Sequence, residues 1–186
     1  MNYNKLRDRA YQCAVAHGWH EEEKSDSHWL CLVISELMEA VEADRKGRHT
    51  NRDQFEYYMN QKTRSDDEFI YAFKHGVKDT VEDELADACI RLFDLAGLRG
   101  FDLSDLELCI EKAFSEPTKR PPFTELCYMY TQVATMERDP LDERVFLLLA
   151  TIIKYHKSVG IDVLWHIEQK MRYNEMRPYK HEDKNY

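Results

Sequence analysis

Apolar residues recur at the spacing of an α-helix along most of this chain. The clearest stripe consists of Leu30, Val33, Ile34, Leu37 and Val41, which share one face of a helix. Turn-forming residues are scarce, since the 186 residues include only 6 Gly and 5 Pro, whereas a β-sandwich or barrel needs a turn roughly every 8 to 12 residues. The sequence therefore predicts an all-α protein built as a helical bundle.

Glycine, proline and N-cap residues mark the ends of the predicted helices. Thr80 has the side chain of an N-cap, and Asp83 three residues later resembles the reciprocal partner in a capping box. Residues 48–79 are mixed and polar, and we interpret them as a long connection with some helix of its own. The predicted helices cover about residues 3–17, 27–46, 80–97, 104–115 (closed by Pro117), 124–138, 141–158 and 163–176.

The length of the chain fits a single domain over residues 1–186. Pro121 and Pro122 mark the clearest internal boundary, between a half of residues 1–120 and a half of residues 121–186. The segment GFDLSDL begins at Gly100, and the similar segment GIDVLWH begins at Gly160, 60 residues later. Two explanations are open: a common helix–Gly–Asp–helix turn used twice, or a duplicated helical hairpin.

The charge balance bears on the partners of the protein. Asp and Glu number 35 against 26 Lys and Arg, a formal net charge of −9. Because non-specific nucleic-acid binding depends on a positive surface, we expect no stable nucleic-acid complex. An excess of carboxylates fits a protein that handles polyphosphates through metal ions, although solubility alone also accounts for it.

Cysteine usage and hydropathy indicate a cytoplasmic location. The 5 Cys include no Cys-x-x-Cys pair and mostly fall in apolar helical patterns, as expected of free thiols in a reducing compartment. A zinc site at His17, His20, His28 and Cys31 is a less favoured alternative, because no tight ligand pair supports it. No run approaches the ~20 apolar residues of a membrane span, and the N-terminus has no apolar signal region.

Two acidic pairs stand on the strongest predicted helices. Glu36 and Glu39 are three residues apart, as are Glu84 and Asp87, so each pair presents two carboxylates on one helical face beside the apolar stripe. If the stripes pack together, the four carboxylates converge and need hard divalent cations. The alternative is that they are solvated acids on two independent helices.

The segments ISELMEAVEA, DELADACIRLFDLAG, GFDL and KMRYNEMRPYKH together resemble the motifs of the MazG-like nucleotide pyrophosphohydrolases, of the all-α NTP pyrophosphohydrolase superfamily. The resemblance covers about residues 27–46, 78–106 and 160–181. It implies that the four carboxylates are catalytic and hold Mg²⁺, with Mn²⁺ as a substitute. It also implies that α-helical residues near the C-terminus contact phosphate or sugar, with a tyrosine packing alongside: Lys170, Tyr173, Asn174 and Arg177.

The implied activity is magnesium-dependent hydrolysis of a nucleoside triphosphate to the monophosphate and pyrophosphate, as in house-cleaning of the nucleotide pool. Related enzymes form homodimers or homotetramers. A catalytically silent nucleotide-binding relative and a helical adaptor protein are the alternatives. His17 and Trp19 could meet the base, but packing roles are favoured for both.

The chain departs from the family pattern in three places. Ser35 stands where many members carry a further Glu, and 44 residues separate Glu39 from Glu84. The Lys-x-x-x-Asn-x-x-Arg element follows only the second Gly turn, whereas the acidic pairs occur only in the first half. We therefore expect a single site formed between the two halves of one chain.

Overall fold

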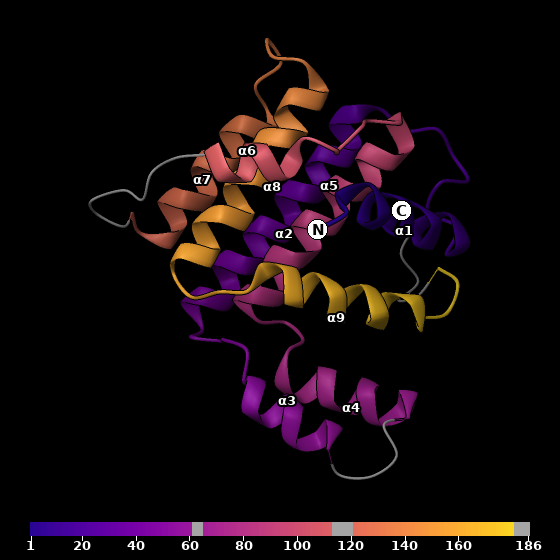
Figure 1. Cartoon of the computed structure of the whole chain (residues 1–186), viewed down its shortest axis with the longest axis vertical. Helices are drawn as coiled ribbons and strands as arrows, with labels where there is room; N and C mark the ends of the chain where they lie inside the picture. Colours follow the sequence, from indigo (N-terminus) through magenta and orange to yellow (C-terminus); the bar gives the residue numbers. More distant parts are fainter. Residues whose placement is uncertain (61–64, 113–120, 181–186) are drawn as a thin grey trace.

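The computed structural model describes residues 1–60, 65–112 and 121–180, and within these ranges it contains helices and no strand (Figure 1). The all-α prediction is therefore confirmed. The helices are α1 (Tyr3–Ala16), α2 (Asp26–Arg45), α3 (Arg52–Met59), α4 (Asp66–Gly76), α5 (Val81–Arg99), α6 (Leu106–Lys112), α7 (Phe123–Ala134), α8 (Leu141–Ser158) and α9 (Val163–Glu175).

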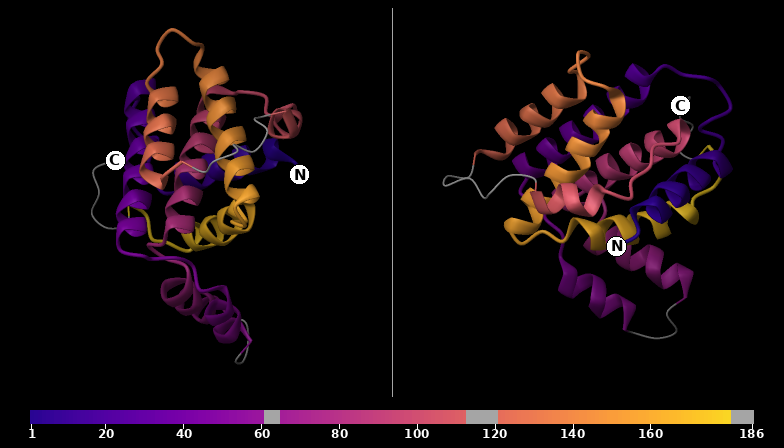
Figure 2. Two further views of the ribbon diagram at one scale, coloured as in Figure 1. Left: turned by 90° about the vertical axis from the view of Figure 1, so that its left-hand side faces the viewer. Right: turned by 45° about the horizontal axis from the view of Figure 1, so that its top comes forward.

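Four helices, α2, α5, α7 and α8, stand side by side and enclose the main core (Figure 2). The apolar stripe of α2 packs against that of α5, which buries Leu37 together with Leu85 and Leu92. Leu148 and Ile152 of α8 complete the same cluster. Each such side chain contributes about 1.5–3 kcal/mol when it leaves water, so this apolar contact holds the acidic faces of α2 and α5 in register.

Two further helices cross the bundle and bring distant parts of the sequence to α5. Helix α1 packs against α5 at Gly97, where an added Cβ would lie 2.5 Å from Cβ of Tyr11, so only glycine permits this approach. Helix α9 also packs against α5 and lies across the lower part of the bundle in Figure 1. The C-terminal element of the sequence thereby reaches the helix that carries Glu84 and Asp87.

The polar stretch 48–79 contains a helical hairpin, α3 and α4, that projects from the bundle (Figure 1). Ser65 and Glu68 form a reciprocal capping box at the start of α4. The hairpin has a small apolar cluster of its own, in which Phe55, Phe69 and Phe73 pack with Tyr173 of α9. The expectation of some helix in this connection is confirmed.

Two predicted details are wrong. Helix α7 ends at Ala134, not near residue 138, because the guanidinium of Arg144 on α8 donates a hydrogen bond of 2.8 Å to the Ala134 carbonyl oxygen where the chain turns. Thr80 does cap α5, with Oγ1 accepting from the Asp83 amide at 3.3 Å, but the Asp83 carboxylate accepts from the Asp79 amide instead of returning to Thr80. Residues 113–115 and Pro117 of the predicted 104–115 helix lie outside the described residues.

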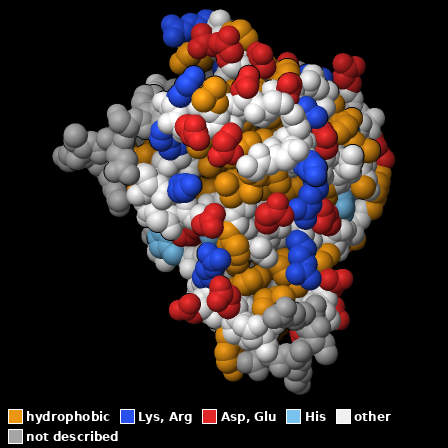
Figure 3. All heavy atoms as spheres, in the orientation of Figure 1, with side chains coloured by type: hydrophobic (Ala, Val, Ile, Leu, Met, Phe, Trp, Pro, Cys, Tyr) orange, Lys and Arg blue, Asp and Glu red, His pale blue; other side chains and the backbone are white. Residues whose placement is uncertain are grey.

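Charged side chains of both signs are interspersed over the face seen in Figure 3. In the described part of the chain, no helix combines the length and apolar character needed to cross a membrane. The five cysteines are free thiols, with Cys89 and Cys127 buried and Cys31 exposed.

Candidate metal centre

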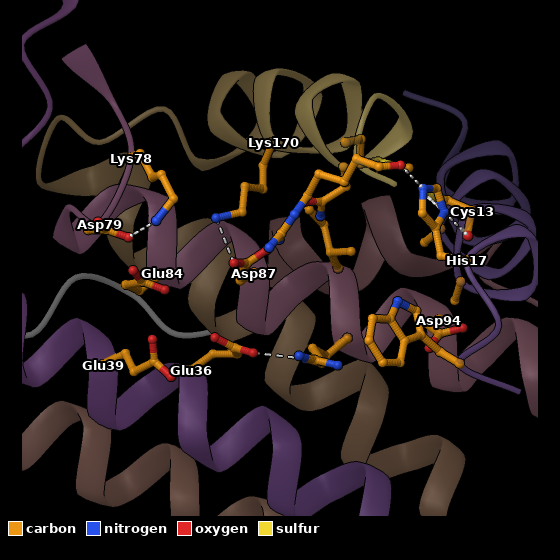
Figure 4. A pocket seen from close by; sticks show the side chains of 18 residues that line it. Cys13, His17, Glu36, Glu39, Lys78, Asp79, Glu84, Asp87, Asp94 and Lys170 are labelled. Carbon is orange, nitrogen blue, oxygen red and sulfur yellow. Dashed lines mark hydrogen bonds and ion pairs between the residues drawn. The ribbon is translucent and has the colours of Figure 1, made fainter. Parts of the chain in front are cut away.

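A polar pocket lies where α1, α2, α5 and α9 meet, with Lys78 and Asp79 from the segment before α5 at one end (Figure 4). Its volume is about 170 Å³, room for several ions or water molecules. All four carboxylates expected from the acidic pairs line it, together with Lys170 and Asn174 of α9 and Arg177, which lies two residues beyond the end of α9. The structure thus brings seven of the eight predicted site residues to one pocket, within a single chain.

Three of the four expected carboxylates converge closely. One oxygen from each of Glu36, Glu39 and Glu84 lies within 4.8 Å of the others. In Figure 4, Glu36 and Glu39 point from α2 toward Glu84 on α5. Glu36 and Glu84 are only 6% and 5% exposed, while Glu39 is exposed to solvent. Hard oxygen ligands in this number and spacing suit Mg²⁺ or Mn²⁺.

The surroundings of these carboxylates also favour a bound cation. Burial, helped by the neighbouring Asp87 carboxylate, raises the pKa of Glu84 to about 8. Burial and Asp87 likewise raise the pKa of Glu36, although the Arg91 guanidinium opposes this through a hydrogen bond from Nε to Oε1 at 2.9 Å. A bound cation would relieve both effects, because it favours the ionised carboxylates.

Lys170 is paired with two carboxylates of α5. Its ammonium is buried and binds carboxylates, with Nζ 2.8 Å from Asp83 Oδ2 and 2.7 Å from Asp87 Oδ2. Burial alone would lower the pKa of Lys170, but the two carboxylates raise it above its usual value. In this state Lys170 is therefore the counter-ion of Asp83 and Asp87, because a buried ammonium needs paired charges.

A second acidic group lies on the other side of Glu84. Oxygens of Asp79, Asp83 and Glu84 also lie within 4.8 Å of one another. Here lysines already supply positive charge, since Lys78 pairs with Asp79 and Lys170 pairs with Asp83. The group of Glu36, Glu39 and Glu84 contacts no lysine among the described residues and is the better candidate for a divalent ion.

The remaining predicted residues of α9 divide into two sets. Asn174 lines the pocket, and its buried Oδ1 has no hydrogen-bond partner among the described residues. Arg177 lines it as well. Tyr173 does not: its ring stacks on Phe73 of the hairpin at 4.6 Å, and the structure gives it a packing role away from the pocket.

The far end of the pocket is formed by α1 and the turn that follows it. His17, Trp19 and Asp94 line this end, so His17 and Trp19 do reach the pocket. The His17 ring ties α1 to the C-terminal segment, with Nδ1 2.7 Å from the Cys13 carbonyl oxygen and Nε2 2.8 Å from that of Arg177. The proposed zinc set of His17, His20, His28 and Cys31 is not among the convergent ligand groups of the described residues, which are all acidic.

Sequence reasoning missed Arg91 and Asp94 of this pocket as well as Asp83, and one signal could have found the first two. Helix α5 is apolar on most sides, yet a row of charged residues follows Glu84 along it at helical spacing: Asp87, Arg91 and Asp94. Such a row on a buried helix marks a polar cavity. Asp83 gave no such signal, because it reads as a capping residue.

Comparisons of the chain with protein-family models, curated proteins and solved structures found no match. The resemblance to MazG-like pyrophosphohydrolases therefore rests on the sequence motifs themselves.

Proposed function

We propose that this chain is a divalent-metal-dependent nucleoside triphosphate pyrophosphohydrolase, which releases a nucleoside monophosphate and pyrophosphate. The observation that carries the proposal is the meeting in one pocket of carboxylates from α2 and α5 with Lys170 and Asn174 from α9 and Arg177 from the turn after it. Carboxylates without these basic and amide groups would serve any cation. Both together suit an anionic substrate that arrives with metal ions.

Glu36, Glu39 and Glu84 would hold the metal, and Asp87 is positioned to join them once Lys170 no longer neutralises it. Mg²⁺ bound there would neutralise phosphate oxygens and acidify a bound water. Glu39 is the exposed member of the group and stands where an ion would enter.

The side chains of α9 and of the turn after it would contact the phosphates and the sugar. Arg177 presents a planar guanidinium that matches phosphate oxygens, whereas Asn174, whose buried Oδ1 is without a partner among the described residues, can accept a hydrogen bond from a sugar hydroxyl. Lys170 is held on Asp83 and Asp87 until a metal ion competes for Asp87. Its ammonium would then have lost one of its two carboxylates and would be available to a phosphate oxygen.

The test is release of pyrophosphate from nucleoside triphosphates, measured with Mg²⁺ and with a chelator. We expect turnover only with the metal, and its loss in Glu39→Gln, which removes one ligand charge from the cluster. Glu42→Gln is the matched control, because Glu42 lies one turn further along α2 and pairs with Arg45 and Lys46 at the surface. Equal activity in both variants would contradict the proposal.

The two alternatives give different results in calorimetry. A catalytically silent relative would bind a triphosphate in the presence of Mg²⁺ and release no pyrophosphate. A helical adaptor would bind neither ligand. If the wild type binds a triphosphate tightly without turnover, and Glu39→Gln loses this binding, the chain is a catalytically silent relative and not a hydrolase.

A further inference from the structure

The pocket has a second acidic position, remote from the metal ligands. Asp94 lies seven residues beyond Asp87 on α5, about 10 Å along the helix axis. The wall between them carries the apolar side chains of Ile90 on α5 and of Ala10 and Ala14 on α1, beside Arg91, whose guanidinium is bonded to Glu36. A ligand anchored at the metal end would therefore place its other end against Asp94, which Figure 4 shows at the opposite side from Glu39.

Asp94 is held in a fixed orientation. Its Oδ1 lies 2.7 Å from Nε2 of His20, and the His20 ring packs between Tyr11 at 5.2 Å and Trp29 at 4.7 Å. The pair is largely buried, with the Asp94 side chain 10% exposed. A carboxylate fixed in this way presents a hydrogen-bond acceptor at a defined place.

The other carboxylate oxygen is left for a ligand. Within the described residues, His20 is the sole hydrogen-bond partner of Asp94, and that contact uses Oδ1. Oδ2 is therefore an acceptor without a partner on a residue that lines the pocket. An ionised carboxylate accepts hydrogen bonds and donates none, so this position favours N–H groups and opposes carbonyl oxygens.

We propose that Asp94 determines base specificity by accepting a hydrogen bond from the exocyclic amino group of the base. The inference rests on the proposed function. It predicts a preference for nucleotides of adenine, cytosine or guanine. Uracil and thymine also carry an N–H on the pairing edge, but carbonyl oxygens flank it on both sides and would face the carboxylate. Trp19, at the same end of the pocket, supplies an aromatic surface for the ring.

The size of the effect follows from what one such contact is worth. A carboxylate that pairs with an amino group discriminates against the wrong base by a factor on the order of 10 to 100. The cleanest comparison uses two pairs of substrates, dCTP against dUTP and dATP against dITP, in which an amino group is replaced by a carbonyl oxygen and the neighbouring ring nitrogen gains a hydrogen. We expect kcat/KM of the wild type to favour the amino-bearing member of both pairs by this factor.

Asp94→Asn keeps the size of the side chain and adds an N–H donor. It should bring both ratios close to one or invert them, chiefly by raising kcat/KM for dUTP and dITP. The matched control is Asp105→Asn, the same change at an exposed site outside the pocket, which should keep the wild-type ratios. A purely structural Asp94–His20 pair would instead lower kcat/KM for all four substrates together and leave the ratios unchanged, which would overturn the proposal.

Equilibrium binding separates this inference from the proposed function. Calorimetry with dCMP and dUMP needs no turnover, and the wild type should bind dCMP more tightly by a similar factor. That result without any pyrophosphate release would refute the hydrolase proposal but support the role of Asp94 in base specificity. If the wild type shows equal affinity for dCMP and dUMP, or equal kcat/KM for dCTP and dUTP, the role of Asp94 in base specificity is refuted, whether or not Asp94→Asn folds.

Discussion

The charge of Glu84 is expected to control the stability of the metal-free protein. Its pKa is about 8 in the folded chain against 4.5 in the unfolded chain. A carboxyl whose pKa is raised by folding stabilises the fold while it is protonated. This stabilisation is lost as the pH rises toward and past the folded pKa, because the unfolded chain is already ionised. Stability should therefore fall as the pH rises through neutrality.

The magnitude can be worked out for an interval in which Glu84 contributes the larger part of the change, while Glu36, whose pKa burial raises to about 7, adds to the fall. Burial lowers the pKa values of His156 and His166 to about 4, so these residues affect stability only below their ordinary pKa of 6.5. Between about pH 6.5 and about pH 8.5, linkage gives a loss of about 2 kcal/mol from Glu84. Since Glu84 faces a pocket open to water, screening reduces the expected loss to roughly 1–2 kcal/mol.

The assay is urea unfolding in the presence of a chelator at both pH values. Glu84→Gln should be at least as stable as the wild type at the higher pH and should show a much smaller loss across the interval. Glu23→Gln, at an exposed position outside the pocket, should behave as the wild type. Added Mg²⁺ should restore the stability of the wild type at the higher pH but not that of Glu84→Gln. A wild-type stability that is flat or rising with pH, or an equally steep fall in Glu84→Gln, would refute the reasoning.

Three further outcomes are expected. Lys170→Met should lower the free energy of unfolding by about 3–5 kcal/mol, because it leaves Asp83 and Asp87 without their counter-ion. In urea titrations the double variant with Asp83→Asn should recover part of this lost stability, and no recovery would count against the pairing. Arg177→Ala should weaken calorimetric binding of triphosphates far more than that of nucleosides, and equal losses would move Arg177 away from the phosphates. His156→Leu should raise the free energy of unfolding by about 1–3 kcal/mol, and the melting temperature with it, because both buried ring nitrogens of His156 have no partner among the described residues. A lower melting temperature would show that these nitrogens are hydrogen-bonded.

The parts of the fold that sequence could predict are those whose apolar residues follow one helical face. The helix predicted for 27–46 appears as Asp26–Arg45, because its stripe packs along the stripe of α5. The sequence pattern did not distinguish the α3–α4 hairpin from the polar connection in which it lies. Its buried aromatic residues, such as Phe55 and Phe73, pack on one another and on α9, and such distant partners leave no periodic signal in a short segment.

The candidate site divides in the same way. Helical spacing places Glu36 beside Glu39 and predicts that they meet Glu84, since this follows from two adjacent stripes. The partner of Lys170 was not predictable, because Asp83 is 87 residues away and both side chains are buried only after α9 crosses α5. Local sequence pattern predicts which face of a helix is acidic, whereas the crossing of helices decides which basic side chain neutralises that face.

The Gly100 and Gly160 turns explain why the pocket combines elements from both halves. Both glycines adopt the left-handed conformation, with φ of 69° and 90°. The helices that follow them exchange partners: α6 packs against α8, and α9 packs against α5. This reciprocal arrangement is typical of a pseudo-symmetric pair and favours a duplicated hairpin over a turn used twice.

The two halves of the chain carry different parts of the site. Sixty residues beyond Glu84 and Asp87 stand Arg144, which bonds the end of α7, and Leu147, which is exposed, so α8 offers no metal ligands at these positions. The helix that packs on the acidic face of α5 is α9, which carries Lys170 and leads directly to Arg177. One chain therefore contains one complete pocket, in whatever oligomer it forms. Mixing Glu39→Gln chains with Arg177→Ala chains should then restore no pyrophosphate release, since each chain keeps its own defect. Recovered activity in the mixture would show that α9 completes the pocket of a neighbouring chain and would overturn the single-chain site.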